Sequence, residues 1–157
     1  MNTIREQLPG LSLAFTKPVI SGLGATRTLN PDESGSLILL DRAAGTTITL
    51  PTAPVPGTFF EFIVATTVTS SSDKIITGAG TELMVGSIVN CDTDSADAVA
   101  IWKALVASSY ISVNLDGSTK GGIKGDRILI TCLNSTTWQV TGVTNGTSNV
   151  ATPFATS

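Results

Sequence analysis

The stretch RILITCLNSTTWQVTGV, residues 127–143, decides the fold of this chain. β-branched and aliphatic residues dominate its two halves, 127–133 and 137–143, and such residues suit a pleated, half-buried surface. Between the halves stand Asn134, Ser135 and Thr136, which favour a turn. The stretch therefore predicts an antiparallel β-hairpin.

Similar short runs, separated by Gly, Pro, Ser, Asp and Asn, extend back to residue 37. They predict further strands at 37–40, 46–50, 59–64, 73–77, 83–89 and 110–115. The run FFEFIV at 59–64 is the most hydrophobic, which predicts a place in the centre of a sheet. Residues 95–105 contain alanines that favour a helix, but Val99 and Ile101 favour a strand. We expect strands there, with a short helix as the alternative.

Turns recur roughly every 8–12 residues, a spacing typical of all-β domains. We expect an antiparallel β-sandwich, jelly-roll-like or a small β-barrel, over residues 26–144. No repeat of 20–50 residues is visible, so a solenoid is not predicted. Proline and glycine interrupt residues 1–25, which are expected to form an extended N-terminal arm. Residues 145–157 are rich in Gly, Ser and Thr and are expected to form a C-terminal tail.

The chain carries little charge: 13% of its residues are charged, and its net charge is −3. The nine Lys and Arg residues are scattered, so direct binding to nucleic acid is not expected. No apolar run approaches about 20 residues, and the first residues lack the apolar core of an export signal. We therefore expect synthesis in the cytoplasm, no membrane contact, and free thiols at Cys91 and Cys132.

The chain contains no histidine, which excludes catalytic triads that depend on imidazole and the usual zinc and copper sites. Most acidic residues stand beside turn residues, where carboxylates commonly cap turns. Residues 92–97, DTDSAD, resemble a calcium loop but lack the glycine and the final glutamate of an EF-hand. Residues 117–126 are rich in Gly and Lys but lack the order of a Walker loop, and are read as a flexible connection. We expect no catalytic, metal or cofactor site.

Several segments in order give the chain a family resemblance. They are TRTLNPDESG at 26–35, AGTTITLP at 44–51, FFEFIV at 59–64, KGGIKGDR at 120–127, the strand with Trp138, and ATPFA at 151–155. This arrangement resembles small virion proteins of tailed bacteriophages, especially head decoration (cement) proteins and related fibre-base domains. The resemblance covers most of residues 26–157.

The resemblance implies a β-sandwich or β-barrel protein that trimerises on the exterior of an assembled capsid and clamps adjacent capsomers. Its partners would be the major capsid protein and its own copies. A cement protein stabilises the mature lattice by binding it in preference to the free subunits.

Three groups of residues carry this hypothesis. The arm residues Leu8, Leu11, Leu13 and Phe15 are expected to lie along the major capsid protein by strand addition or groove packing. Phe154 is expected to contact a neighbouring subunit or capsomer. The core is expected to contain Phe59, Phe62, Val64, Ile128, Ile130 and Trp138.

Two alternatives remain open at this point. In a tail or head fibre domain that binds a host-surface glycan, Trp102, Tyr110 or Trp138 would be exposed rather than buried. In a small carbohydrate-active enzyme, two of the acidic side chains would face each other across a cleft.

Overall fold

The computed structural model of the chain describes residues 17–94 and 98–157. Within these ranges the regular structure is almost entirely β, since the helical elements are two 3-10 turns, η1 (Pro31–Glu33) and η2 (Val106–Ser108). A seven-stranded sheet consists, in spatial order, of β1 (Val19–Ile20), β3 (Leu37–Leu40), β5 (Phe59–Val64), β10 (Arg127–Asn134), β11 (Thr137–Gly146), β7 (Leu83–Asp92) and β8 (Val99–Ala104). A five-stranded sheet consists of β12 (Phe154–Ala155), β9 (Ser112–Leu115), β6 (Asp73–Ile76), β4 (Thr47–Thr49) and β2 (Thr26–Thr28).

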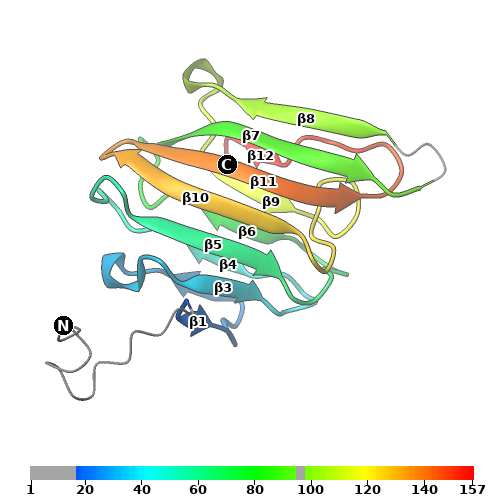
Figure 1. The fold of residues 1–157 in the computed structure, drawn as a ribbon, viewed down its shortest axis with the longest axis horizontal. Helices are drawn as coiled ribbons and strands as arrows, with labels where there is room; N and C mark the ends of the chain where they lie inside the picture. Colours follow the sequence, from blue (N-terminus) through cyan, green and yellow to red (C-terminus); the bar gives the residue numbers. More distant parts are fainter. Residues whose placement is uncertain (1–16, 95–97) are drawn as a thin grey trace, which may run out of the picture.

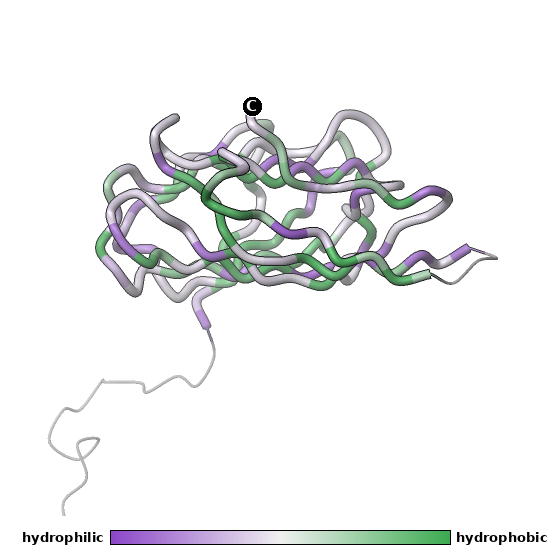
Figure 2. The backbone as a smooth tube through the Cα atoms, turned by 90° about the horizontal axis from the view of Figure 1, so that it is seen from above, coloured by the Kyte–Doolittle hydropathy of each residue, from purple (hydrophilic) through white to green (hydrophobic). Residues whose placement is uncertain are grey.

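The two sheets lie one over the other, with the seven-stranded sheet in front in Figure 1. Figure 2 shows the same two layers from above. Neither sheet closes on itself, because each ends in two different edge strands: β1 and β8 in the larger sheet, β12 and β2 in the smaller. The all-β prediction is confirmed.

The predicted hairpin is present as β10 and β11, which pair in antiparallel register from Arg127 opposite Val143 to Cys132 opposite Trp138. A bulge follows Cys132 before the turn. The strand expected at 59–64 also forms as predicted: β5 is an interior strand, between β3 and β10. Residues 99–104 form β8, and η2 follows directly.

The prediction of an antiparallel fold is wrong, because both sheets are mixed. From β1 to β6, successive strands alternate between the two sheets, and strands two apart in the chain are neighbours within a sheet. The pairs β1–β3, β3–β5, β2–β4 and β4–β6 are consequently parallel. The polar turn after Leu40 thus leads into the opposite sheet instead of closing a hairpin. A short turn permits either path, and packing of both strands against one core decides between them.

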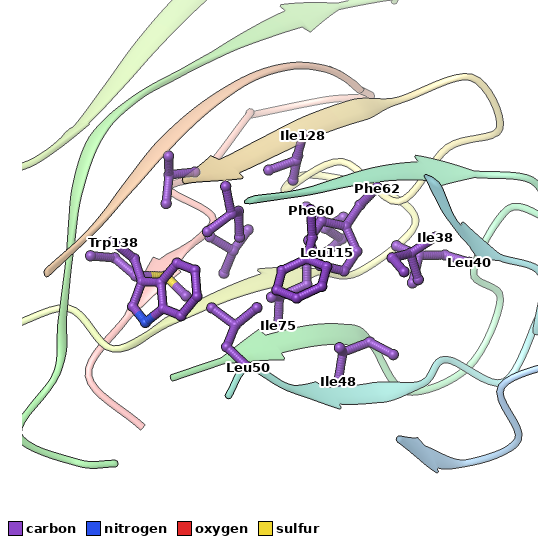
Figure 3. Packing of buried hydrophobic residues seen from close by; sticks show 14 of the residues in the cluster. Ile38, Leu40, Ile48, Leu50, Phe60, Phe62, Ile75, Leu115, Ile128 and Trp138 are labelled. Carbon is purple, nitrogen blue, oxygen red and sulfur yellow. The ribbon is translucent and has the colours of Figure 1, made fainter. Parts of the chain in front are cut away.

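The core lies between the sheets and draws side chains from both (Figure 3). Phe60, Phe62 and Trp138 come from the larger sheet, while Ile48 and Ile75 come from the smaller. The rings of Phe60 and Trp138 lie 6.5 Å apart, within the range of favourable aromatic pairs. The expected core residues Phe62, Val64, Ile128, Ile130 and Trp138 are all buried.

Phe59 corrects the core prediction. It alternates with buried Phe60 along β5 and is only half-buried, because its side chain points to the outer face of the sheet. There the ammonium of Lys17 lies 5.8 Å from the centre of its ring.

Stacked turns join the strands at one end of the molecule. The backbone N–H of Thr46 donates a hydrogen bond to Asp73 (2.8 Å), and the Thr46 hydroxyl donates one to the carbonyl of Gly24 (2.9 Å). Gly45 has φ +74°, and a Cβ there would lie 2.3 Å from the carbonyl oxygen of Ser72. The close stacking of these turns therefore requires glycine at position 45.

The described parts of the two ends are integrated into the sheets, which moves the boundaries expected for an arm and a tail. Val19 and Ile20 pair with β3, and Leu23 is buried in the core. At the other end β11 continues to Gly146, and β12 pairs with β9. Short strands such as these gain their stability from packing, which local composition does not reveal.

Candidate functional site

The outer face of the seven-stranded sheet carries an unusual number of apolar side chains; we call it the aliphatic face. Its members share outward positions on strands whose alternate residues enter the core. They are Val19, Leu37, Leu39, Phe59, Ile63, Leu129, Leu133, Val143, Val85, Val89, Val99 and Ile101. Val99, Ile101 and Val143 are 64%, 60% and 55% exposed. Soluble monomers rarely expose so much contiguous apolar surface, and larger patches mark interaction sites.

Two shallow hollows mark this face. The larger, of about 480 Å³, lies over β7 and β8 and is lined by Val85, Gly86, Ser87, Ile101, Lys103, Ala104, Leu105 and Val106. The smaller, of about 250 Å³, lies over the hairpin and is lined by Arg127, Leu129, Thr141, Gly142 and Val143. Their walls are mostly aliphatic, with a single cation each. Such walls suit apolar side chains of a partner better than a charged or sugar ligand.

A charged cluster stands within the aliphatic face. Glu61 is buried on β5 and forms ion pairs with Lys17 and Arg127. The hydrogen bond from Lys17 lowers the pKa of Glu61; burial opposes that shift, and the charge of Arg127 adds to it. The cluster carries one net positive charge, so it offers the face a polar anchor beside the hollow over the hairpin.

The outer face of the five-stranded sheet is different in chemistry. Thr26 and Thr28 on β2 stand beside Thr47 and Thr49 on the parallel strand β4. Lys74 and Asn114 continue this row across β6 and β9. We call it the threonine face. Its side chains are mostly polar, whereas those of the aliphatic face are mostly apolar, so the two sides of the molecule suit different environments.

The buried carboxylates serve the fold. Asp126 accepts hydrogen bonds from the backbone N–H groups of Gly122, Ile123 and Asn145. Glu82 accepts from the indole of Trp138 (3.1 Å) and from the backbone N–H of Ala53 (2.8 Å). These contacts confirm that carboxylates beside turns cap them. In the described part of the chain, no three acidic or cysteine side chains gather closely enough to hold a metal ion.

The loops singled out in the sequence also bond within the protein. Asp116 accepts hydrogen bonds from the backbone N–H groups of Ser118 and Lys120 (both 2.9 Å), which ties down the start of the Gly-rich stretch. That stretch connects β9 to β10, and the connection between strands is confirmed. In the acidic loop, Asp94 accepts from the backbone N–H of Ser148 (2.8 Å). Asp97 lies outside the described residues.

Asp73 is a buried carboxylate with only one of its two oxygens hydrogen-bonded among the described residues. Its Oδ1 accepts the bond from Thr46, but its buried Oδ2 finds no donor among the described residues. Burial raises the pKa of Asp73 to about 6. Since the usual value of 3.8 holds in the unfolded chain, the folded state keeps its proton to higher pH, and the free energy of unfolding falls between pH 3.8 and about 6.

We expect Asp73→Asn to stabilise the protein at high pH. Asparagine keeps an acceptor for Thr46 and cannot ionise, so the variant avoids the loss of stability that the wild type suffers as pH rises from 3.8 to about 6. The variant should gain about 3 kcal/mol in unfolding free energy at pH 8, and little at pH 3.5. Urea denaturation of both proteins at pH 3.5, 5, 6.5 and 8 measures the difference. Parallel pH profiles would contradict the assignment.

The sequence-predicted contact residues divide into two groups. Leu8, Leu11, Leu13 and Phe15 lie outside the described residues. Phe154 is not a surface peg: it is buried in β12, its ring stacked on Tyr110 at 5.7 Å. The polar residues around Phe154 suggested a free tail, but pairing with β9 draws its side chain into the core.

The three aromatic side chains considered for a glycan site all lie in the described part of the chain, and none of them is exposed. Trp138 is fully buried, and Trp102 and Tyr110 are partly buried against the core. Cys91 and Cys132 are free thiols, as predicted; Cys132 is buried and Cys91 half-buried. No helix in the part of the chain that the structure describes has the length and apolar character needed to cross a membrane.

Sequence reasoning missed the aliphatic face. A signal was present, because the runs LILL (37–40), FFEFIV (59–64) and RILITCL (127–133) are apolar at both alternating sets of positions. A strand with only one face in a core needs only one such set. The second set is what the aliphatic face displays. Comparison of the chain with protein-family models, with curated proteins and with solved structures found no match.

Proposed function

We propose that this chain is a structural virion protein of a tailed bacteriophage that binds the outside of the assembled capsid as a trimer and stabilises it. The observation that carries the proposal is the aliphatic face, a large apolar surface that favours burial against protein. In the particle, this face packs on the major capsid protein and on neighbouring copies, and the threonine face meets the solvent.

The chemistry of the two faces supports a role in assembly. Burial of apolar area stabilises a complex by roughly 25 cal/mol per Å², before the cost of association, so a broad aliphatic contact suits a permanent structural partner. The two sheets act as the β-sandwich platform of a decoration protein. Three copies held together strengthen attachment further, because the first contact raises the effective concentration of the others.

The test uses purified capsids of the phage that encodes the protein, stripped of it and then mixed with added protein. We expect the wild type to sediment with expanded capsids and to raise the temperature at which they rupture. Val143→Asp places a charge on the aliphatic face and should weaken binding at least tenfold, since a carboxylate buried without a partner is costly. Thr28→Asp, on the threonine face, should bind like the wild type.

Either of two results would overturn the proposal. Wild-type protein that is absent from purified particles and does not sediment with capsids would exclude a decoration role. Equal loss of binding in Val143→Asp and Thr28→Asp would exclude the aliphatic face as the attachment surface. Circular dichroism of each variant ensures that the comparison is made between folded proteins.

A further inference from the structure

Strand β8 is a long exposed edge in a protein whose other edges are short. The other edge strands, β1, β2 and β12, contain two or three residues each, whereas β8 contains six. Among the described residues, the backbone of Val99–Ala104 bonds to β7 on one side and to no strand on the other. Such an edge presents unpaired N–H and C=O groups that can accept another strand.

The side chains around this edge are mostly apolar, which favours contact with another protein segment. Val99 and Ile101 point outward and are well exposed, and Lys103 is the one charged residue of the strand. Directly beside them, Leu105 and Val106 close the end of the 480 Å³ hollow. A strand added along β8 would therefore lay its own outward side chains beside an apolar depression.

We propose that residues 11–16 of a second copy of this chain pair with β8 as an eighth strand of the sheet. This inference rests on the self-association included in the proposed function and specifies its contact. The segment reads LSLAFT, with Leu11, Leu13 and Phe15 alternating with the small residues Ser12, Ala14 and Thr16. That alternation places the three large side chains on one side of an added strand, where they extend the aliphatic face.

The donated segment must come from another copy, because residues 11–16 are too short to cross their own sheet to β8. Thr16 is bonded to Lys17, which stands beside β1, at the opposite edge of the sheet from β8. Six strand spacings separate the two edges, about 29 Å at roughly 4.8 Å each. Six extended residues span at most about 20 Å. Residues 11–16 therefore cannot reach β8 of their own sheet, but the equivalent segment of a neighbour can.

This contact has a defined symmetry. The donated segment leaves from the β1 edge, and the acceptor is the β8 edge, so each copy uses two different surfaces. Contacts of this kind run head to tail and close into a ring when the rotation permits. In a ring of three copies, every β8 edge pairs with a strand from a neighbour. Residues 11–16 then contact another copy of this chain, and not the capsid protein that was expected from the sequence as their partner.

The first experiment measures the mass of the full-length protein alone by native mass spectrometry and light scattering. We expect a trimer for wild type and a monomer for both Leu13→Asp and Val99→Asp. The matched control is Val55→Asp, the same change at a valine of similar exposure, 69% against 64%, in the loop before β5. It should remain trimeric. A monomeric wild type, or a trimeric Val99→Asp, overturns the inference.

A crosslinking experiment separates donation between copies from folding back within one chain. In a Cys91→Ser background, since Cys91 pairs with Val99 in the register, Leu13→Cys protein is mixed with Ile101→Cys protein and oxidised. We expect a disulfide between the two species. A third protein carries both Leu13→Cys and Ile101→Cys in one chain. The absence of a disulfide in the mixture, or a disulfide within single chains of this third protein, overturns the inference.

Both measurements are made without capsids, which keeps this inference distinct from the proposed function. A wild-type trimer crosslinked at these positions that fails to bind capsids contradicts the decoration role and leaves the strand exchange standing. A monomeric wild type that binds capsids contradicts the strand exchange and leaves the capsid-binding role standing.

Discussion

Trp138→Ala is expected to lower the free energy of unfolding by about 3–5 kcal/mol, the usual range for deletion of a large buried aromatic side chain. Trp138 is fully buried between the sheets, where its ring meets Phe60. Its loss opens a cavity in the core. It also removes the indole donor from Glu82, a buried carboxylate to which the described residues then offer only the N–H of Ala53.

Replacement by phenylalanine separates the two effects. Trp138→Phe retains most of the volume but still deprives Glu82 of a donor, which should cost about 1–3 kcal/mol. Trp102→Phe is the matched control, because the indole N–H of Trp102 is buried and finds no acceptor among the described residues. That variant should be neutral or slightly stabilising. Urea denaturation followed by far-ultraviolet circular dichroism measures all three, and equal effects of the two phenylalanine variants would refute the role of Glu82.

Asp126→Ala is expected to cost about 4 kcal/mol or more. The carboxylate accepts four hydrogen bonds: from the backbone of Gly122 (2.8 Å), Ile123 (3.1 Å) and Asn145 (2.9 Å), and from the Asn145 side chain (2.7 Å). Asp126 is buried, so alanine leaves these donors without a partner and with little water to replace it. Each unsatisfied buried donor costs about 1–3 kcal/mol, although the sum is not strictly additive.

Hydrogen exchange locates the effect. The amide protons of Gly122, Ile123 and Asn145 should exchange much faster in Asp126→Ala, because these are the donors that lose their acceptor. Asp32→Ala, at an exposed position in η1, is the control and should change stability by no more than about 0.5 kcal/mol. Unchanged exchange at the three amides would contradict the role assigned to Asp126.

Much of the fold could be predicted from local pattern. The runs at 59–64, 127–133 and 137–143 formed strands because β-branched and aromatic side chains favour a pleated surface wherever that surface is placed. The turn at 134–136 closed a hairpin because its flanking strands are adjacent in the chain and joined by a short polar connection. Carboxylates beside turns capped them, since the hydrogen bond that the Ser118 N–H donates to Asp116 spans only two residues.

Direction and partner of the other strands could not be predicted in this way. The residues 37–40 and 47–49 look alike whether they pair with each other or lie in opposite sheets, and they do the latter. Phe154 stands in a polar segment, yet β9, some forty residues earlier in the chain, supplies the pairing that buries it. Phe59 belongs to the most hydrophobic run but points outward, since the register with β10 assigns Phe60 and Phe62 to the core.

The all-β class and most of the longer strands follow from the sequence, because strand propensity and turn chemistry act over a few neighbouring residues; the short strands β1, β2 and β12 do not. The alternation of the chain between two mixed sheets and the outward aliphatic face of one sheet became visible in the three-dimensional structure alone. The structure also showed β8 as a long open edge. These properties depend on which side of each strand the core occupies, and that choice is made by the packing of distant segments together.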